Sequence, residues 1–144
     1  MLSSLMRLLG LKADPTITVD HPSLGTLRYD REVSAWRAIV ETKSGQIGFL
    51  ISGAEVPDGG LIQHAAEIAA APADFQSKVR AFLEQEAAAQ PEWAADIAGL
   101  SLQEVCLFWP DRPNDGMLYF SPDEPRVWRC DYVNRTPIGL GFDS

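Results

Sequence analysis

The chain has 144 residues, 46% hydrophobic and 22% charged, which is the size and composition of one globular domain with a core of its own. Twelve Lys and Arg oppose 20 Asp and Glu, giving a net charge of -8. That charge argues against sequence-independent binding to nucleic acid or to an anionic membrane surface, which both need a cationic protein surface. No apolar run is long enough for a membrane-spanning helix, and the N-terminal stretch has only weak features of a secretory signal. The acidic composition is typical of a bacterial-type cytosolic protein, so we expect a cytoplasmic protein.

We expect a single domain over residues 1–144, with an N-terminal amphipathic helix and lead-in over residues 1–14. Gly10 and then Asp14–Pro15 end this helix, whose apolar face consists of Leu2, Leu5, Met6 and Leu9. A helix this short is marginal in water on its own. We therefore expect it to dock on its own domain or, in decreasing order of preference, on a second subunit or partner, or on a membrane surface.

Alternation of apolar and polar residues predicts a first meander of three strands. These strands are expected over Thr16–Asp20, Ala35–Glu41 and Ile47–Ile51, separated by turn-forming sequences. Helical periodicity follows over residues 61–71, then in a stripe from Phe75 to Leu83 after Pro72, and then in a short segment after Pro91.

A second meander of three strands is predicted near the C-terminus. The strands are expected over Glu104–Pro110, Met117–Ser121 and Val127–Val133. Both faces of the first of these are apolar, so we expect it to be central in its sheet or covered on both sides. The chain therefore predicts an α+β fold: an antiparallel sheet of about six strands, with two or three helices packed on one face and a short N-terminal helix.

Few residues suggest chemistry. The two histidines, His21 and His64, do not occur in a metal-binding motif, and no nucleophile motif or phosphate-binding glycine pattern is present. The two cysteines, Cys106 and Cys130, are interpreted as buried thiols in a reducing compartment. We therefore assign no catalytic, cofactor-binding or metal-binding residue, and expect no cofactor.

Charged residues of the C-terminal third are the candidates for an interaction site. Most of them lie in the turns between the predicted strands, where carboxylates also serve local hydrogen bonding. The two strand residues among them are predicted to pair on the surface. The candidate set is Asp111, Asp115, Asp123, Glu124, Arg129 and Asp131.

The segment Leu24-Gly25-x-Leu27-x-Tyr29-Asp30, followed by a strand containing Trp36, resembles the opening of small uncharacterised bacterial α+β domains. The resemblance covers roughly residues 20–142. It implies a helical middle and a terminal meander, and some such domains are suspected to act as immunity or interaction proteins. It implies no catalytic residues.

Two functional hypotheses remain. The first is a non-catalytic protein-interaction or immunity-like module that binds another protein or a second copy of itself, including as a homodimer, but not nucleic acid. The second is a small-molecule-binding domain or enzyme with a pocket between sheet and helices. A pocket with convergent polar groups, such as His64 beside a carboxylate or thiol, would favour the second hypothesis. A flat acidic or apolar surface would favour the first.

Overall fold

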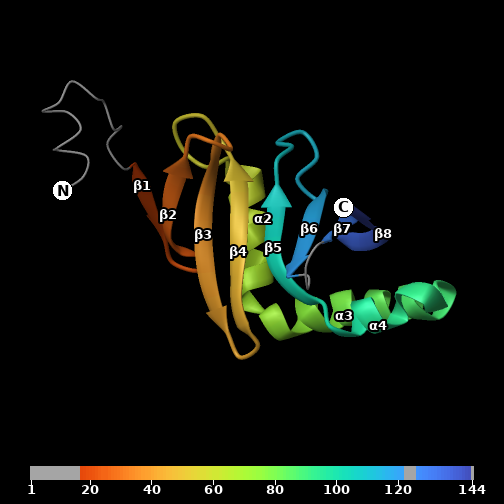
Figure 1. The fold of residues 1–144 in the computed structure, drawn as a ribbon. Coiled ribbons are helices and arrows are strands. Elements are labelled where there is room, and N and C mark those ends of the chain that lie inside the picture. Colours follow the sequence, from red (N-terminus) through yellow and green to blue (C-terminus); the bar gives the residue numbers. More distant parts are fainter. Residues whose placement is uncertain (1–16, 122–125, 144) are drawn as a thin grey trace, which may run out of the picture.

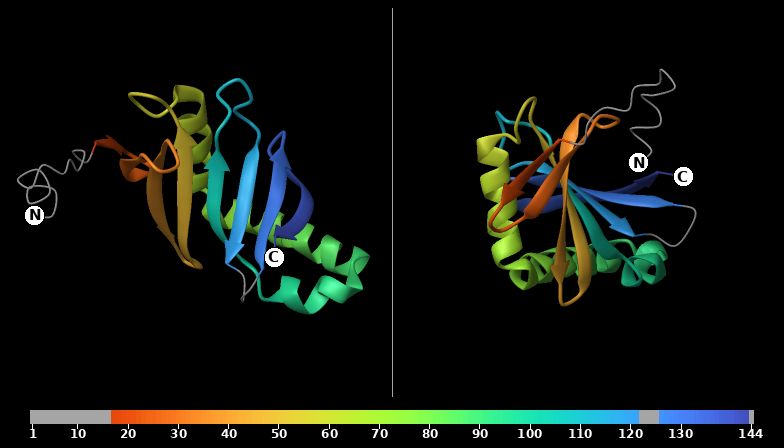
Figure 2. Two further views of the ribbon diagram at one scale, coloured as in Figure 1. Left: turned by 45° about the horizontal axis from the view of Figure 1, so that its top comes forward. Right: turned by 90° about the vertical axis from the view of Figure 1, so that its left-hand side faces the viewer.

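A computed structural model describes residues 17–121 and 126–143, and these form one open sheet of eight strands with helices on one side (Figures 1 and 2). The N-terminal strands are β1 (Thr18–His21), β2 (Gly25–Asp30), β3 (Ala35–Thr42) and β4 (Gly45–Ser52). The helices are α2 (Gly59–Ala70), α3 (Pro72–Ala89), the 3-10 helix η1 (Pro91–Trp93) and α4 (Ala94–Ala98). The C-terminal strands are β5 (Ser101–Leu107), β6 (Gly116–Ser121), β7 (Val127–Val133) and β8 (Thr136–Asp143).

The strands lie side by side in the order in which they occur along the chain. Every neighbouring pair is antiparallel except β4 and β5, which are parallel and run in register from Gly48–Glu104 to Ile51–Leu107. The helices between these two strands carry the chain back to the end of the sheet at which β4 begins, so that β5 runs in the same direction. A parallel pair needs such a crossover connection. β5 is thus central in the sheet, between β4 and β6.

The α+β class agrees with the sequence prediction, but the prediction of about six antiparallel strands is wrong, because the sheet is mixed and has eight strands. The two missed strands are β2 and β8. β2 starts at Gly25 in a positive-φ conformation, and its apolar residues resemble a lead-in to the next turn. β8 contains Pro137, Gly139 and Gly141, which are typical of loops but tolerated in an edge strand. The predicted helix over residues 1–14 lies outside the described residues.

Local sequence explains where the helices begin and which faces they bury. The Asp58 carboxylate accepts a hydrogen bond from the Leu61 backbone N–H at 3.1 Å and so caps α2. Pro72 occupies the first turn of α3, where its missing N–H costs nothing. The predicted stripe of α3 is confirmed, with Phe75, Val79 and Leu83 buried against the sheet. None of the described helices has both the length and the apolar content needed to cross a membrane.

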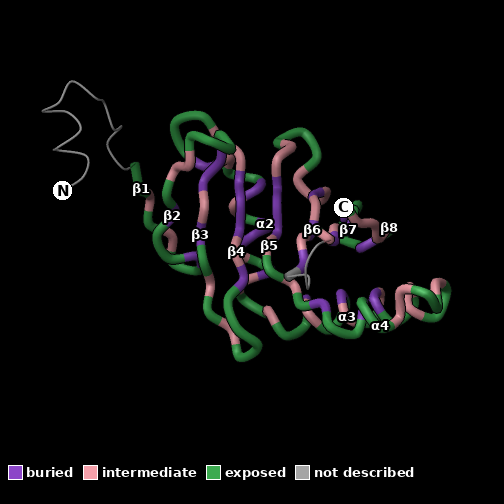
Figure 3. Tube along the Cα trace, viewed as in Figure 1, coloured by how far each residue is buried: buried purple, intermediate pink, exposed green. Residues whose placement is uncertain are grey.

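The core lies between the helices and one face of the sheet. Its largest fully buried side chains include Trp36, Phe49, Phe120 and Trp128. Trp93 of η1 packs edge-on against Trp128, with ring centroids 5.5 Å apart. The Trp36 indole N–H donates to the Gly53 carbonyl at 3.1 Å, so its polar atom is also satisfied. Figure 3 shows long buried stretches in β4 and β5, with exposed residues at the hairpin ends.

Candidate functional site

The two faces of the sheet differ in what lies over them. The covered face packs on α2, α3 and α4 and contributes the strand residues of the core. We call the opposite side the open face, because none of the described helices lies over it; Figure 1 looks onto this side, with β3 and β4 in front of α2.

Strand registers place the open-face residues in rows that cross the sheet. One row from β3 to β8 consists of Ile39, Gly48, Glu104, Tyr119, Arg129 and Gly141. The adjacent row consists of Arg37, Leu50, Cys106, Met117, Asp131 and Gly139. The open face therefore brings together side chains that are up to about one hundred residues apart in the chain.

A small apolar cluster lies on the open face over the middle strands β3 to β6. We call it the open-face cluster; its buried members are Ala35, Leu50 and Cys106, and its half-buried members are Phe108, Met117 and Tyr119. Aromatic residues and methionine are enriched in protein–protein interfaces. In the part of the chain that the structure describes, no helix lies over the cluster, and charged side chains lie beside it.

Charged side chains beside the cluster form ion pairs. Arg37 of β3 donates to Glu104 Oε2 at 2.7 Å and to Asp30 Oδ2 at 3.2 Å, which links β3 to β5 across β4 and to its neighbour β2. Arg129 pairs with Asp143 of β8 at 2.6 Å. The side chains of Arg37 and Arg129 keep 38% and 36% of their surface exposed, so solvent screens each pair, and each contributes only about 0.2–1 kcal/mol.

The two cysteines lie on opposite faces of the sheet, two strands apart, so the fold does not bring them together. Cys106 belongs to the open-face cluster and Cys130 to the core. Burial raises the pKa of Cys106, and the nearby Glu104 carboxylate raises it further. Burial also raises the pKa of Cys130 to about 11. Both thiols are therefore protonated at neutral pH and are poor nucleophiles.

His64 is buried on the covered side of the sheet, and both of its ring nitrogens have partners. Nδ1 lies 2.6 Å from the Pro113 carbonyl and Nε2 lies 3.2 Å from the Tyr132 hydroxyl. Because a carbonyl only accepts, Nδ1 carries the proton and Nε2 accepts from Tyr132. Burial lowers the pKa of His64. This neutral histidine joins α2 to the β5–β6 loop and to β7, and it leaves no nitrogen free for catalysis.

The turn between β7 and β8 contains a second set of long-range contacts. Asn134 and Arg135 have φ values of 55° and 63°. Two-residue hairpin turns of this kind need a positive φ at both central residues, a conformation that is unfavourable for arginine. Arg135 donates to Asn114 Oδ1 at 2.8 Å and to Glu67 Oε1 at 2.7 Å. Its carbonyl accepts from Lys78 at 2.7 Å. The turn is thereby tied to α2, α3 and the β5–β6 loop.

The candidate interaction residues do not form one site. Asp111 is exposed in the β5–β6 loop, whereas the Asp115 carboxylate accepts from the Asn134 N–H at 2.9 Å and stabilises the neighbouring turn. Asp131 and Arg129 lie on the open face, but the guanidinium pairs with Asp143 and not with Asp131 as predicted. Asp123 and Glu124 lie outside the described residues.

The residues that carry the family resemblance have structural roles. Leu24 and Leu27 are buried in the core, and Gly25 has a φ of 72° at the β1–β2 turn. Asp30 accepts from the Glu32 N–H at 3.0 Å as well as from Arg37. The segment thus stabilises the first hairpin and positions one end of the open-face ion-pair network.

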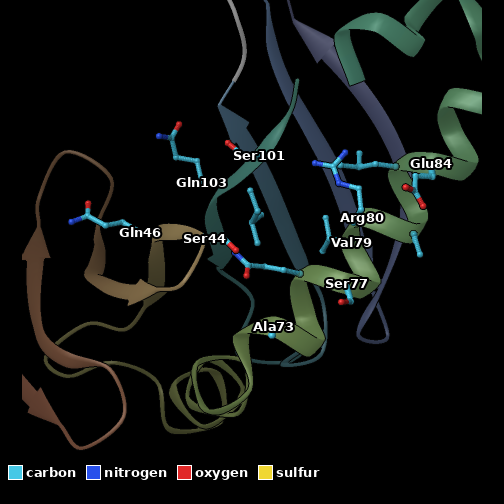
Figure 4. Close-up of a pocket in the computed structure, with 13 residues that line it drawn as sticks. Ser44, Gln46, Ala73, Ser77, Val79, Arg80, Glu84, Ser101 and Gln103 are labelled. Atoms are coloured by element: carbon cyan, nitrogen blue, oxygen red, sulfur yellow. The ribbon is translucent and has the colours of Figure 1, made fainter. Parts of the chain in front are cut away.

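A cavity of about 770 Å³ lies between the β3–β4 hairpin, the start of β5 and the helix α3 (Figure 4). Its lining carries the neutral polar residues Ser44, Gln46, Gln76, Ser77, Ser101 and Gln103. Its charged residues are Arg80 and Glu84, and neither histidine nor cysteine lines it. The volume is in the range of small-molecule sites, but the catalytic pairing of a base with a nucleophile is not built there.

The functional-site candidates that sequence reasoning missed are Arg37 and Glu104. In the sequence each is a charged residue that lies beside an apolar one on β3 or β5, and nothing local indicates that the two pair. Within residues 17–121 and 126–143, no group of three His, Cys, Asp or Glu side chains is arranged to hold a metal ion. Comparison with protein families, curated proteins and solved structures found no match to this chain.

Proposed function

We propose that this protein is a non-catalytic protein-interaction module that binds its partner through the open face of the sheet. The observation that carries the proposal is the open-face cluster, a contiguous apolar group on a sheet face that the described helices leave uncovered. Apolar surface that includes half-buried aromatic side chains is what a partner protein can cover.

The surroundings of the cluster support a partner of mixed charge. Arg37 and Arg129 lie beside it together with the carboxylates of Asp30, Glu104 and Asp143, and every one of these groups already has an opposite charge nearby. A highly basic or acidic partner would gain little from so balanced a surface. We therefore infer that the partner places an apolar side chain on the cluster and polar groups around it, which is the usual plan of an interface.

The chemistry of the titratable groups supports a role other than catalysis. Both ring nitrogens of His64 have partners, and both thiols are protonated at neutral pH. The immunity-like role implied by the family resemblance is compatible with this proposal, because an immunity protein acts by binding.

Two matched substitutions test the proposal. Ile39 lies on the open face with 58% exposure, and Val56, in the loop after β4, has 61%. Ile39→Glu and Val56→Glu therefore place the same charge at equally exposed sites. We expect affinity capture from the source cell to recover one partner with wild-type protein and with Val56→Glu, and to lose it with Ile39→Glu.

Sedimentation of the purified chain examines whether the partner is a second copy. A dimer that Ile39→Glu dissociates and Val56→Glu does not would identify a homodimer across the open face. The proposal fails if the chain is monomeric and recovers no partner, or if both variants behave as wild type.

A further inference from the structure

The ladder between β4 and β5 covers only part of each strand. Its pairs run from Gly48–Glu104 to Ile51–Leu107, although β4 begins at Gly45 and β5 at Ser101. The first three residues of each strand therefore lie outside this ladder: those of β4 pair with β3, and Ser101 and Leu102 of β5 pair with β6. Because the strands are parallel, both unpaired segments lie at the same end of the sheet, where Figure 1 shows β4 and β5 diverging.

Contacts made by α3 hold this gap open. Arg80 Nη2 donates to the Leu100 carbonyl at 2.5 Å, and Nη1 lies 3.5 Å from the Ile97 carbonyl. These bonds fix the chain that leads into β5 against α3, away from β4. Within β5 the register shifts between Leu102 and Glu104, so Gln103 forms a bulge. A bulge bends its strand and re-aims a side chain, and bulges are common beside binding sites.

The gap coincides with the 770 Å³ cavity, which we call the β4–β5 slot. β4 forms one wall with Gln46, β5 forms the other with Ser101 and Gln103, and α3 forms the floor with Ser77 and Val79 (Figure 4). Each wall is a short strand edge whose backbone groups on that side are not used by the β4–β5 ladder. Such edges are the sites at which proteins add a strand from another chain.

We propose that the β4–β5 slot binds an extended peptide segment, which adds as a short strand along β4 or β5. Three residues of free edge on each wall match a segment of about three to five residues, since a strand advances about 3.3 Å per residue. Alternate side chains of the segment would face α3, where Val79 and Leu83 provide an apolar floor, and the others would face the amides and hydroxyls at the rim.

The lining also specifies the charge of the segment. Its polar groups are mostly amides and hydroxyls. Its two charged residues, Arg80 and Glu84, have opposite charges, and the guanidinium of Arg80 already binds the Ile97 and Leu100 carbonyls. An uncharged segment with apolar residues at every second position therefore fits best. This site shares no residue with the open-face cluster, so the test of peptide binding does not depend on the partner proposed above.

Selection from a display library of random heptapeptides against the full chain tests this proposal. We expect enrichment of uncharged sequences with alternating apolar residues. Ser77→Trp fills the slot from an exposed position, whereas Gln85→Trp places the same side chain on the exposed side of α3 outside the slot. The selected peptide should bind Ser77→Trp at least tenfold more weakly and Gln85→Trp within twofold of wild type.

A second experiment tests whether the slot binds the backbone of the peptide. Methylation of alternate backbone nitrogens in the selected peptide should weaken binding at least tenfold, because it removes the donors that a strand ladder needs. Amide hydrogen exchange should slow at Gly45–Ile47 or Ser101–Gln103 in the complex. The proposal is overturned if no peptide is enriched, if Ser77→Trp binds like wild type, or if the methylated peptide binds unchanged. It is also overturned if a neutral trisaccharide binds in the slot and no peptide does.

Discussion

The covered face of the sheet packs Trp36, Phe49 and Trp128 against helices, whereas the open face holds Arg37 and Glu104 in ion pairs that solvent reaches. Within one strand the two kinds of side chain alternate, as Trp36 and Arg37 do on β3. A parallel strand pair is usually buried on both faces by its crossover helices. Here all the crossover helices lie on one face, and within residues 17–121 and 126–143 no helix covers the other face of β4 and β5.

The difference between the two faces predicts that the covered face stabilises the fold and that the open face is available for binding. Apolar burial contributes in proportion to the area removed from water, so the covered face should carry most of the free energy of folding. Half-exposed ion pairs contribute little, so the open face can change with little cost to folding. Four measurements can break or sharpen this distinction.

The largest expected effect is on the covered face. Trp128 is 2% exposed. The centroid of its ring lies 5.5 Å from that of Trp93 and 4.7 Å from that of Phe142. Trp128→Ala should lower the free energy of unfolding by about 3–5 kcal/mol through lost burial and the cavity left behind. Denaturant titration measures this change. A loss below about 1 kcal/mol would contradict the inference that the covered face provides most of the free energy of folding.

The second effect is a pH response of the covered face through His64. The folded pKa of this histidine is lowered, so the unfolded chain binds a proton more readily. The neutral ring's contribution is complete above about pH 6.5 and falls by up to about 1.4 kcal/mol per pH unit as the pH drops below that value, until the folded pKa is reached.

A variant isolates this response. His64→Gln should be less stable at neutral pH, because it breaks the contacts to Pro113 and Tyr132, and its stability should change less between pH 7 and pH 5 than that of wild type. Denaturant titrations at both pH values measure the change. Equal pH dependence in the two proteins would assign the response to other groups.

A smaller effect is expected from the ion pairs of the open face. Arg37→Met keeps much of the apolar stem but removes the charge that holds Asp30 and Glu104. We expect a loss of about 1 kcal/mol that shrinks in high salt, because screening weakens half-exposed pairs. Arg28 lies opposite Arg37 on β2, so Arg28→Met is the matched control.

Removal of Arg28 takes away a like charge and should leave stability unchanged or slightly raised. Thermal unfolding at low and high salt compares the two variants. An equal loss in both, or a loss in Arg37→Met that salt leaves unaltered, would show that packing rather than charge stabilises this region.

The smallest effect is expected at Ile39. This side chain lies on the open face with 58% exposure, so Ile39→Ala should change the free energy of unfolding by less than about 0.5 kcal/mol. Urea titration against wild type measures the change. A cost near that of Trp128→Ala would mean that the open face is part of the folding core.

Local sequence was sufficient for the helices and for the alternation of the strands. The Asp58 cap, Pro72 and the stripe of α3 act over one or two helical turns, and their physics is complete within a short window. The same holds for the strand that places Cys106 and Phe108 on one face and Val105 and Leu107 on the other, since successive side chains of a strand must alternate.

Tertiary structure decided the rest, because the deciding contacts join distant residues. β8 is a strand because it pairs with β7, and its one proline and two glycines hide that outcome in the sequence. Arg37 and Glu104 are 67 residues apart, and they meet only because the helices bring β5 beside β4. The open-face cluster and the β4–β5 slot both follow from that one parallel pairing, for which no local pattern carries a signal.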